Sequence, residues 1–220
     1  MEEEKKEIQK ETKEKREKEK SVLGEIWEWT YCIFLAVVIT LLVKNLIFST
    51  TIVRKESMVP TLQDGNILII ERLAQVMGKP LNRGDIVVVE APQQSTVAED
   101  GMRYAYYPED NVAQKFIKLF SKTLYIKRVI GLPGEHLVID GDDIYINGEK
   151  LDEPYTNPDR EKFPPEYDMD ITIPEGYVFC VGDNRDRSMD SRYFGVIPID
   201  KVEGKTSFRL FPFNKFGKIE

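Results

Sequence analysis

The hydrophobic and polar positions divide the chain into one long apolar stretch near its start and a series of short apolar runs after residue 66. Trp29 to Val43 gives 15 residues without a charge, and Leu46 to Phe48 extends the apolar character to 20 positions if Lys44 and Asn45 are tolerated near one end. That is about the length that a bilayer requires. The pattern predicts a single transmembrane helix over residues 27–49.

The residues at the two ends of this stretch fit a membrane span. Trp27, Trp29 and Tyr31 lie where an interfacial aromatic belt would place them, and Lys44 could extend to the interface at the other end. The alternative is a cleavable secretory signal, which has an apolar region of similar length. The following residues, Phe48 to Val53, offer no A-x-A-like cleavage site, so the membrane span is the favoured interpretation.

The short apolar runs are rich in Val, Ile and Tyr, and each is bounded by Gly, Pro, Asn or Asp, which is typical of strands joined by turns. Asn147-Gly148 predicts a type I′ hairpin turn that leads back through Glu149 to Leu151. The sequence therefore predicts a mainly β fold, an antiparallel domain of Greek-key or barrel type. The predicted strands are Ile67–Glu71, Asp85–Glu90, Tyr125–Ile130, His136–Ile139, Ile144–Ile146, Ile171–Ile173 and Tyr177–Val181.

One segment interrupts the strand pattern. Residues 93–123 are long for a loop and are predicted to be an insertion. Within it, Asn111 to Ser121 places Val112, Phe116 and Leu119 near helical spacing, with Asn111 as a candidate N-cap. The pattern predicts a short amphipathic helix. It would pack on its own domain or, as the alternative, lie on a membrane surface.

Charge gives the orientation and limits the partners. The first 20 residues hold eight Lys/Arg and eight Glu, and residues 1–26 are predicted to be a charged cytoplasmic tail. Because only Lys44, Arg54 and Lys55 follow the apolar stretch closely, the positive-inside rule places residues 50–220 outside the cell, on the plasma membrane. From Thr50 onward, 22 Lys/Arg and 28 Asp/Glu leave a net charge of −6, which argues against a nucleic-acid partner.

The cysteine and histidine content limits the available chemistry. Cys32 falls in the predicted membrane segment and Cys180 in the external part, so no disulfide can join the external domain to itself. His136 is the single histidine, which excludes a metal centre with several imidazoles. A Ser-His-Asp triad would have to use His136, but nothing beside it in the sequence is arranged to hold a catalytic base.

Lysine can act as a base where burial lowers its pKa, because burial disfavours the ammonium form. In Tyr125 to Ile130, strand alternation places Lys127 and Arg128 on opposite faces, so one of the two cations must point toward a packed side. The alternative is that Lys127 lies on a solvated face. From this run alone the two interpretations are equally favoured.

Two further runs carry candidate groups. Ser57 follows an extended segment and precedes Pro60, which predicts a sharp turn where the hydroxyl can project and the Ser57 N–H can face a substrate carbonyl. Gly182 to Arg192 holds three Asp, three Arg, two Ser and an Asn in eleven residues. That density predicts either a charged surface turn or an ion-paired scaffold that orients catalytic groups.

In their order and spacing, these runs resemble the motifs of bacterial type I signal peptidases, also called leader peptidases. The resemblance covers the apolar stretch and nearly all of residues 51–211. The matching runs are S-M-V-P-T-L from Ser57, R-G-D-I-V-V from Arg83, K-R-V-I-G-L-P-G-E from Lys127 and G-D-N-R-D-R-S-M-D-S-R from Gly182.

The resemblance implies a role for individual residues. Ser57 would be the nucleophile that forms the acyl-enzyme, and Lys127 the general base. Ser188 would orient Lys127, while Asp183 with Arg128 and Asp190 with Arg192 would form structural ion pairs.

The resemblance also has an implication for the fold, and at one position this chain differs from some members of the family. It implies a second, smaller β subdomain at about residues 134–174 within the peptidase domain 50–220. Some family members carry a serine two positions before the nucleophile that completes the oxyanion hole, and this chain has Lys55 there. The oxyanion hole would then depend on the Ser57 N–H and on further groups nearby that the sequence does not identify.

The function implied is a membrane-bound serine endopeptidase that removes signal peptides after small residues at −1 and −3, with no cofactor and no metal. Its expected partners are preprotein signal peptides, the lipid bilayer and, as a further candidate, the export machinery. Two alternatives are a non-enzymatic membrane-anchored β scaffold and a Ser-Lys protease of the self-cleaving repressor type.

Overall fold

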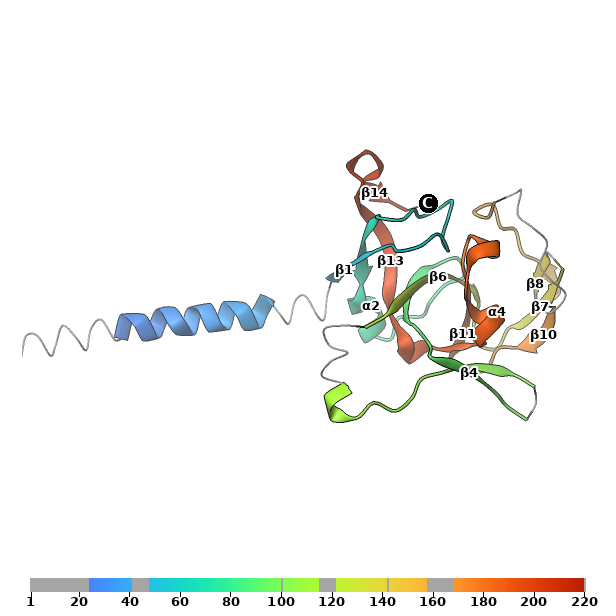
Figure 1. The fold of residues 1–220 in the computed structure, drawn as a ribbon, viewed down its shortest axis with the longest axis horizontal. Coiled ribbons are helices and arrows are strands. Elements are labelled where there is room, and N and C mark those ends of the chain that lie inside the picture. The colour runs from blue at the N-terminus through green and yellow to red at the C-terminus, as the bar shows by residue number, and fades with distance from the viewer. Residues whose placement is uncertain are drawn as a thin grey trace, which may run out of the picture. The chain divides into compact units, whose positions relative to one another are not determined.

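The computed structural model describes residues 24–40, 48–99, 101–114, 122–141, 143–157 and 168–219. The chain separates into two compact units, Met1–Asn45 and Leu46–Glu220. The described part of the first unit is a helix over residues 24–40 (Figure 1). Among the described residues, no helix is both long enough and apolar enough to cross a membrane. The predicted span 27–49 includes residues 41–47, which lie outside the described residues, as does most of the predicted tail 1–26.

The second unit is mainly β, as predicted. Its principal sheet is antiparallel and curled, with strand order β1-β2-β13-β3-β6-β11-β12, and β14 pairs with β13 (Figure 1). The strands are β1 (Phe48–Ile52), β2 (Ile67–Glu71), β3 (Ile86–Glu90), β6 (Leu124–Gly131), β11 (Tyr177–Val181), β12 (Ile197–Pro198), β13 (Val202–Phe211) and β14 (Gly217–Lys218).

A smaller four-stranded sheet with the order β10-β7-β8-β9 occupies part of the region where the second β subdomain was expected. Its strands are β7 (His136–Asp140), β8 (Asp143–Ile146), β9 (Glu149–Lys150) and β10 (Met169–Thr172). Asn147 and Gly148, with φ of 52° and 84°, join β8 to β9, which confirms the predicted hairpin turn.

The predicted insertion contains a hairpin that the sequence pattern did not reveal, formed by β4 (Gln94–Val97) and β5 (Arg103–Tyr106). Residues 112–114 are helical. The Asn111 side chain accepts from the Gln114 N–H, and the Asn111 N–H donates to the Gln114 side chain, each at 2.9 Å, which confirms Asn111 as the cap. The rest of the predicted helix, 115–121, lies outside the described residues.

Short helices complete the second unit. Besides the helical residues 112–114, those in the described part of the unit are α2 (Arg72–Val76), α4 (Ser191–Phe194) and the 3₁₀ turns η2 (Arg185–Arg187), η3 (Ile199–Lys201) and η4 (Phe213–Lys215).

One apolar cluster of the second unit supports the segment that carries Ser57. Met58 and Leu62 from this segment pack among Leu68, Ile86 and Ile126 from β2, β3 and β6. Met58 is 1% exposed and Leu62 is fully buried. Burying a side chain of this size contributes about 1.5–3 kcal/mol, so the two together fix the turn firmly to the sheet.

Candidate active site

Ser57 lies on a turn that is held from both sides. Within the turn, the Val59 N–H donates to the Glu56 carbonyl at 3.1 Å and the Leu62 N–H to the Met58 carbonyl at 2.8 Å. From the loop that follows β11, the Asn184 N–H donates to the Ser57 carbonyl at 3.1 Å. The side chain of Ser57 is partly exposed. The turn therefore presents the hydroxyl from a backbone with little freedom to move.

The backbone just before Ser57 has an unusual conformation. Lys55 has a φ of +72°, which is uncommon for a residue other than glycine. Its N–H donates to the Asp64 Oδ1 at 2.9 Å, which helps to hold it there. In the described part of the chain, no acceptor is bonded to the Ser57 N–H. That N–H is therefore available to an oxyanion, the arrangement that acyl transfer requires.

Lys127 lies in the middle of β6, opposite Val87 of β3, and is 2% exposed. Burial lowers the pKa of its amine to about 8, although the charge of Asp190 acts in the opposite direction. The amine also lies 5.5 Å from the centre of the Tyr125 ring. At mildly alkaline pH a large fraction of Lys127 is therefore neutral and able to accept a proton.

The prediction that one of the two adjacent cations points toward a packed side is confirmed for Lys127, and Arg128 is buried as well, with 7% exposure. The physical reason is that β6 is an inner strand of the curled sheet and is covered on both faces. On the other face, the guanidinium of Arg128 lies 4.0 Å from the centre of the Tyr155 ring.

Ser57 and Lys127 line the same cleft, which has a volume of about 740 Å³. One wall is the segment from Thr50 to Lys55, and the other includes the beginning of β6. This volume lies within the range of about 300–1,000 Å³ that is typical of ligand sites. No hydrogen bond joins the Ser57 hydroxyl to the Lys127 amine among the described residues. The structure thus brings the two groups to one cleft without a hydrogen bond between them.

The loop after β11 is an ion-paired scaffold rather than a solvated turn. Arg128 donates to both oxygens of Asp183, at 2.8 and 2.7 Å, and Asp183 is fully buried. Thr61, from the run that begins at Ser57, donates to the same carboxylate at 2.6 Å. Asp183 therefore joins the strand of Lys127 to the segment of Ser57.

Asp190 and Arg192 form the second buried pair. Arg192 donates through Nε and Nη2 to the two carboxylate oxygens at 2.8 and 2.9 Å, and the Gly182 N–H donates to the same carboxylate at 3.0 Å. Burial alone would raise the pKa of the Asp190 carboxyl, but the hydrogen bonds and charge of Arg192 hold it below its ordinary value. The nearby Ser188 hydroxyl also lowers the pKa of Asp190, although its position does not meet the geometry of a normal hydrogen bond. Asp190 consequently stays ionised although it is buried.

Ser188 lies close to the backbone of Ser57. Its hydroxyl is buried and forms no hydrogen bond with any described residue. A Cβ placed on Gly182 would lie 2.2 Å from the Ser188 Oγ and 2.4 Å from the Ser57 carbonyl oxygen. The three residues are therefore packed so closely that only glycine fits at position 182. The Ser188 hydroxyl thus lies next to the backbone of the candidate nucleophile and makes no hydrogen bond of normal geometry to a described residue.

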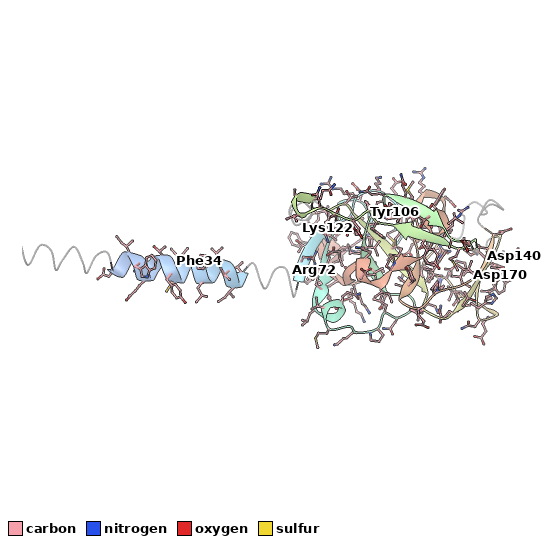
Figure 2. The ribbon with its side chains drawn as sticks, turned by 90° about the horizontal axis from the view of Figure 1, so that it is seen from below. Phe34, Arg72, Tyr106, Lys122, Asp140 and Asp170 are labelled. Carbon is pink, nitrogen blue, oxygen red and sulfur yellow. The ribbon has the colours of Figure 1, made fainter. Side chains whose placement is uncertain are left out.

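His136 lies outside this cleft. It is exposed, and its Nε2 lies 2.5 Å from Asp170 Oδ1, which is 75% exposed. In Figure 2, Asp170 and Lys122, a residue of the cleft wall, lie at opposite ends of the second unit. No group of three or more potential metal ligands occurs among the residues that the structure describes.

Several contacts of the site were not found by sequence reasoning. Arg187 pairs with Glu56 at 2.6 Å, and Arg185 forms a buried pair with Glu153. The partners are far apart in the sequence, so no local pattern signals them. Thr61 could have been found, because it lies in the same short run as Ser57.

The chain matches the family model described as signal peptidase, peptidase S26, over residues 26–211. It is 34% identical to signal peptidase I of Bacillus caldolyticus, over 90% of this chain and 97% of that protein, and 35% identical to signal peptidase I of Bacillus licheniformis, over 93% and 98%. A crystal structure of a signal peptidase I from Enterococcus faecalis V583 matches with 31% identity and a TM-score of 0.38, over 58% of this chain and 97% of that one.

Proposed function

The chain belongs to the signal peptidase I family, peptidase S26, and we propose that Ser57 and Lys127 are the nucleophile and general base with which it removes signal peptides from exported preproteins. Membership makes it a serine endopeptidase and argues against a non-enzymatic scaffold. The relatives, all named signal peptidase I, argue against a self-cleaving repressor.

The observation that carries the proposal is a nearly fully buried lysine in the cleft that also contains the serine. A lysine with the ordinary pKa of 10.5 would be neutral in about 0.3% of molecules at pH 8, whereas Lys127, with a pKa of about 8, is neutral in about half. Burial thus raises the fraction of usable base by roughly a hundredfold. A hydrogen bond between the two groups is expected to form when substrate is bound.

In the proposed reaction, the neutral Lys127 amine takes the proton of the Ser57 hydroxyl as Oγ attacks the scissile carbonyl carbon. The negative oxygen of the tetrahedral intermediate accepts a hydrogen bond from the Ser57 N–H. When the intermediate collapses, the C–N bond breaks, the Lys127 ammonium protonates the departing amine, and the signal peptide remains as an ester on Ser57. Lys127 then deprotonates a water, which hydrolyses the ester and regenerates Ser57.

The supporting roles follow from the scaffold. Ser188 would direct the Lys127 amine with its hydroxyl, and the pairs of Asp183 with Arg128 and Asp190 with Arg192 would hold that region in place. The proposed preference for small residues at −1 and −3 is supported by family membership, and the apolar wall residues Val53 and Ile126 would favour uncharged side chains.

The proposed location is the outer face of the plasma membrane, with residues 27–49 as a single span, residues 1–26 in the cytoplasm and the peptidase domain outside. Lys/Arg asymmetry and family membership support it. The proposed partners are signal peptides of preproteins, the bilayer and, further, the export machinery. A tether at the membrane would raise the local concentration of enzyme where cleavage sites emerge.

Cleavage of a preprotein with an A-x-A site tests the proposal. The full chain in detergent should release the mature protein with the expected new N-terminus, and Ser57→Ala and Lys127→Met should each lower kcat by at least about a thousandfold. Ser95→Ala and Lys79→Met, which change exposed residues outside the cleft, are the matched controls. Substantial cleavage by either dyad variant would refute the dyad.

A further inference from the structure

The walls of the catalytic cleft carry only one sign of charge. Five cationic side chains line it, and no carboxylate is among its described lining residues: Arg54, Lys55, Lys122, Lys127 and Arg187. The chain as a whole has a net charge of −7. The cleft is therefore a local positive region on an acidic protein, and such a region attracts negatively charged ligands.

Three of these five cations are balanced or neutral. Lys122 lies 2.5 Å from Glu203, and Arg187 lies 2.6 Å from Glu56. Lys127 loses its charge as the pH rises through about 8. At the mildly alkaline pH at which neutral Lys127 can act as a base, none of the three therefore offers an unpaired positive charge to a substrate.

Arg54 and Lys55 are the two that remain. Both are exposed, and within the described residues no carboxylate forms an ion pair with either side chain. Asp64 accepts the backbone N–H of Lys55, but Asp64 is not a lining residue of the cleft. The tight turn with positive φ at Lys55 fixes the backbone of this pair next to the nucleophile.

We propose that Arg54 and Lys55 form a recognition site for an acidic side chain of the substrate close to the cleavage point. This inference rests on the proposed function. Because the two residues precede Ser57 by three and two positions, their backbones lie within about 11 Å of it. An extended substrate spans that distance in about three residues, and the long side chains of Arg54 and Lys55 reach one or two residues further.

The expected effect can be derived from two exposed charge pairs. Changing an aspartate of the substrate to lysine replaces attraction by repulsion at both cations. The change removes two attractions and adds two repulsions. If each of these four contributions changes kcat/KM by about 1.8-fold, their product is about tenfold at low ionic strength. Screening should reduce it to about threefold in 0.5 M salt.

The test uses peptides with one A-x-A site that differ at a single position, aspartate against lysine, scanned on both sides of the cut except at −1 and −3. The full chain in neutral detergent should prefer aspartate about tenfold at one or more positions. Arg54→Gln with Lys55→Gln should remove the preference. The matched control, Lys79→Gln with Lys218→Gln, changes the net charge equally at exposed sites outside the cleft and should retain it.

The outcomes separate this inference from the proposed function. If no peptide is cleaved, the proposed function fails. If peptides are cleaved but no position prefers aspartate, or the preference survives in the Arg54 and Lys55 double variant, the inference alone is overturned. Loss of binding to vesicles with anionic lipid in that double variant, without any peptide preference, would assign the two cations to lipid headgroups and also overturn it.

Discussion

Replacement of Lys127 by methionine should inactivate the enzyme and at the same time stabilise its fold. The side chain is 2% exposed, and burial is the main cause of its lowered pKa. Below pH 8 the folded protein therefore keeps an ammonium group in surroundings that disfavour it. Methionine is apolar and unbranched, so it fills similar space without this penalty.

The magnitude follows from the pKa. A change from 10.5 in the unfolded chain to about 8 in the folded chain corresponds to about 2.5 units, and at about 1.36 kcal/mol per unit the penalty is about 3 kcal/mol. Below pH 8 both states bind the proton and the penalty is complete. Between about pH 8 and 10.5 the unfolded state binds more protons, so the stability of the parent protein rises with pH. Above 10.5 both states are neutral and the penalty disappears.

The assay is urea unfolding of the parent protein, Lys127→Met and the exposed-site control Lys79→Met at pH 7 and pH 10. Lys127→Met should be more stable than the parent at pH 7, by up to about 3 kcal/mol, and the difference should fall to about 1 kcal/mol at pH 10, where the unfolded chain is still partly protonated. If Lys127→Met is more stable than the parent by the same amount at both pH values, or is less stable than the parent at pH 7, the buried Lys127 ammonium does not destabilise the folded protein and the reasoning is refuted.

Three further predictions concern the scaffold around the dyad. Gly182→Ala should lower kcat/KM by at least about tenfold, because its Cβ would lie 2.4 Å from the Ser57 carbonyl oxygen and displace the turn; unchanged peptide cleavage would contradict this. Asp190→Asn leaves the buried Arg192 charge without its carboxylate and should lower the free energy of unfolding by about 3–5 kcal/mol, measured with urea; a loss below about 1 kcal/mol would argue against a structural role. Ser188→Ala should leave thermal stability nearly unchanged, because the hydroxyl has no described partner, but should lower kcat by about 5- to 150-fold with little change in KM; an unaltered kcat would remove Ser188 from the mechanism.

Local patterns predicted most strands, because apolar runs between turn residues need no knowledge of the rest of the chain. The long strand β13 was missed for a physical reason. Its inward positions include Val202, Gly204 and Thr206, so the buried face lacks an apolar alternation. Gly204 is required there because a Cβ would lie 2.7 Å from the Glu71 carbonyl oxygen of β2. Close approach of two strands is a tertiary requirement that hydropathy does not express.

The site was predictable where its residues lie in short dense runs, as with Ser57, Lys127 and the loop from Gly182. The ambiguity at Lys127 could not be resolved from alternation, because both faces of β6 are covered. The positive charge of the cleft could not be predicted from the sequence either, because Arg54 and Lys122 come from segments that are far apart in the chain. Only the folded chain shows which carboxylates reach these cations.

The pH dependence of kcat/KM on a signal-peptide substrate that titrates nowhere near pH 8 tests the central claim most directly. If neutral Lys127 is the general base, kcat/KM should rise about tenfold per pH unit below a single ionisation near pH 8 and reach a plateau above it. A profile that is flat from pH 6 to 10, or that rises through about 6.5 as for an ordinary histidine, would contradict the Ser57–Lys127 dyad.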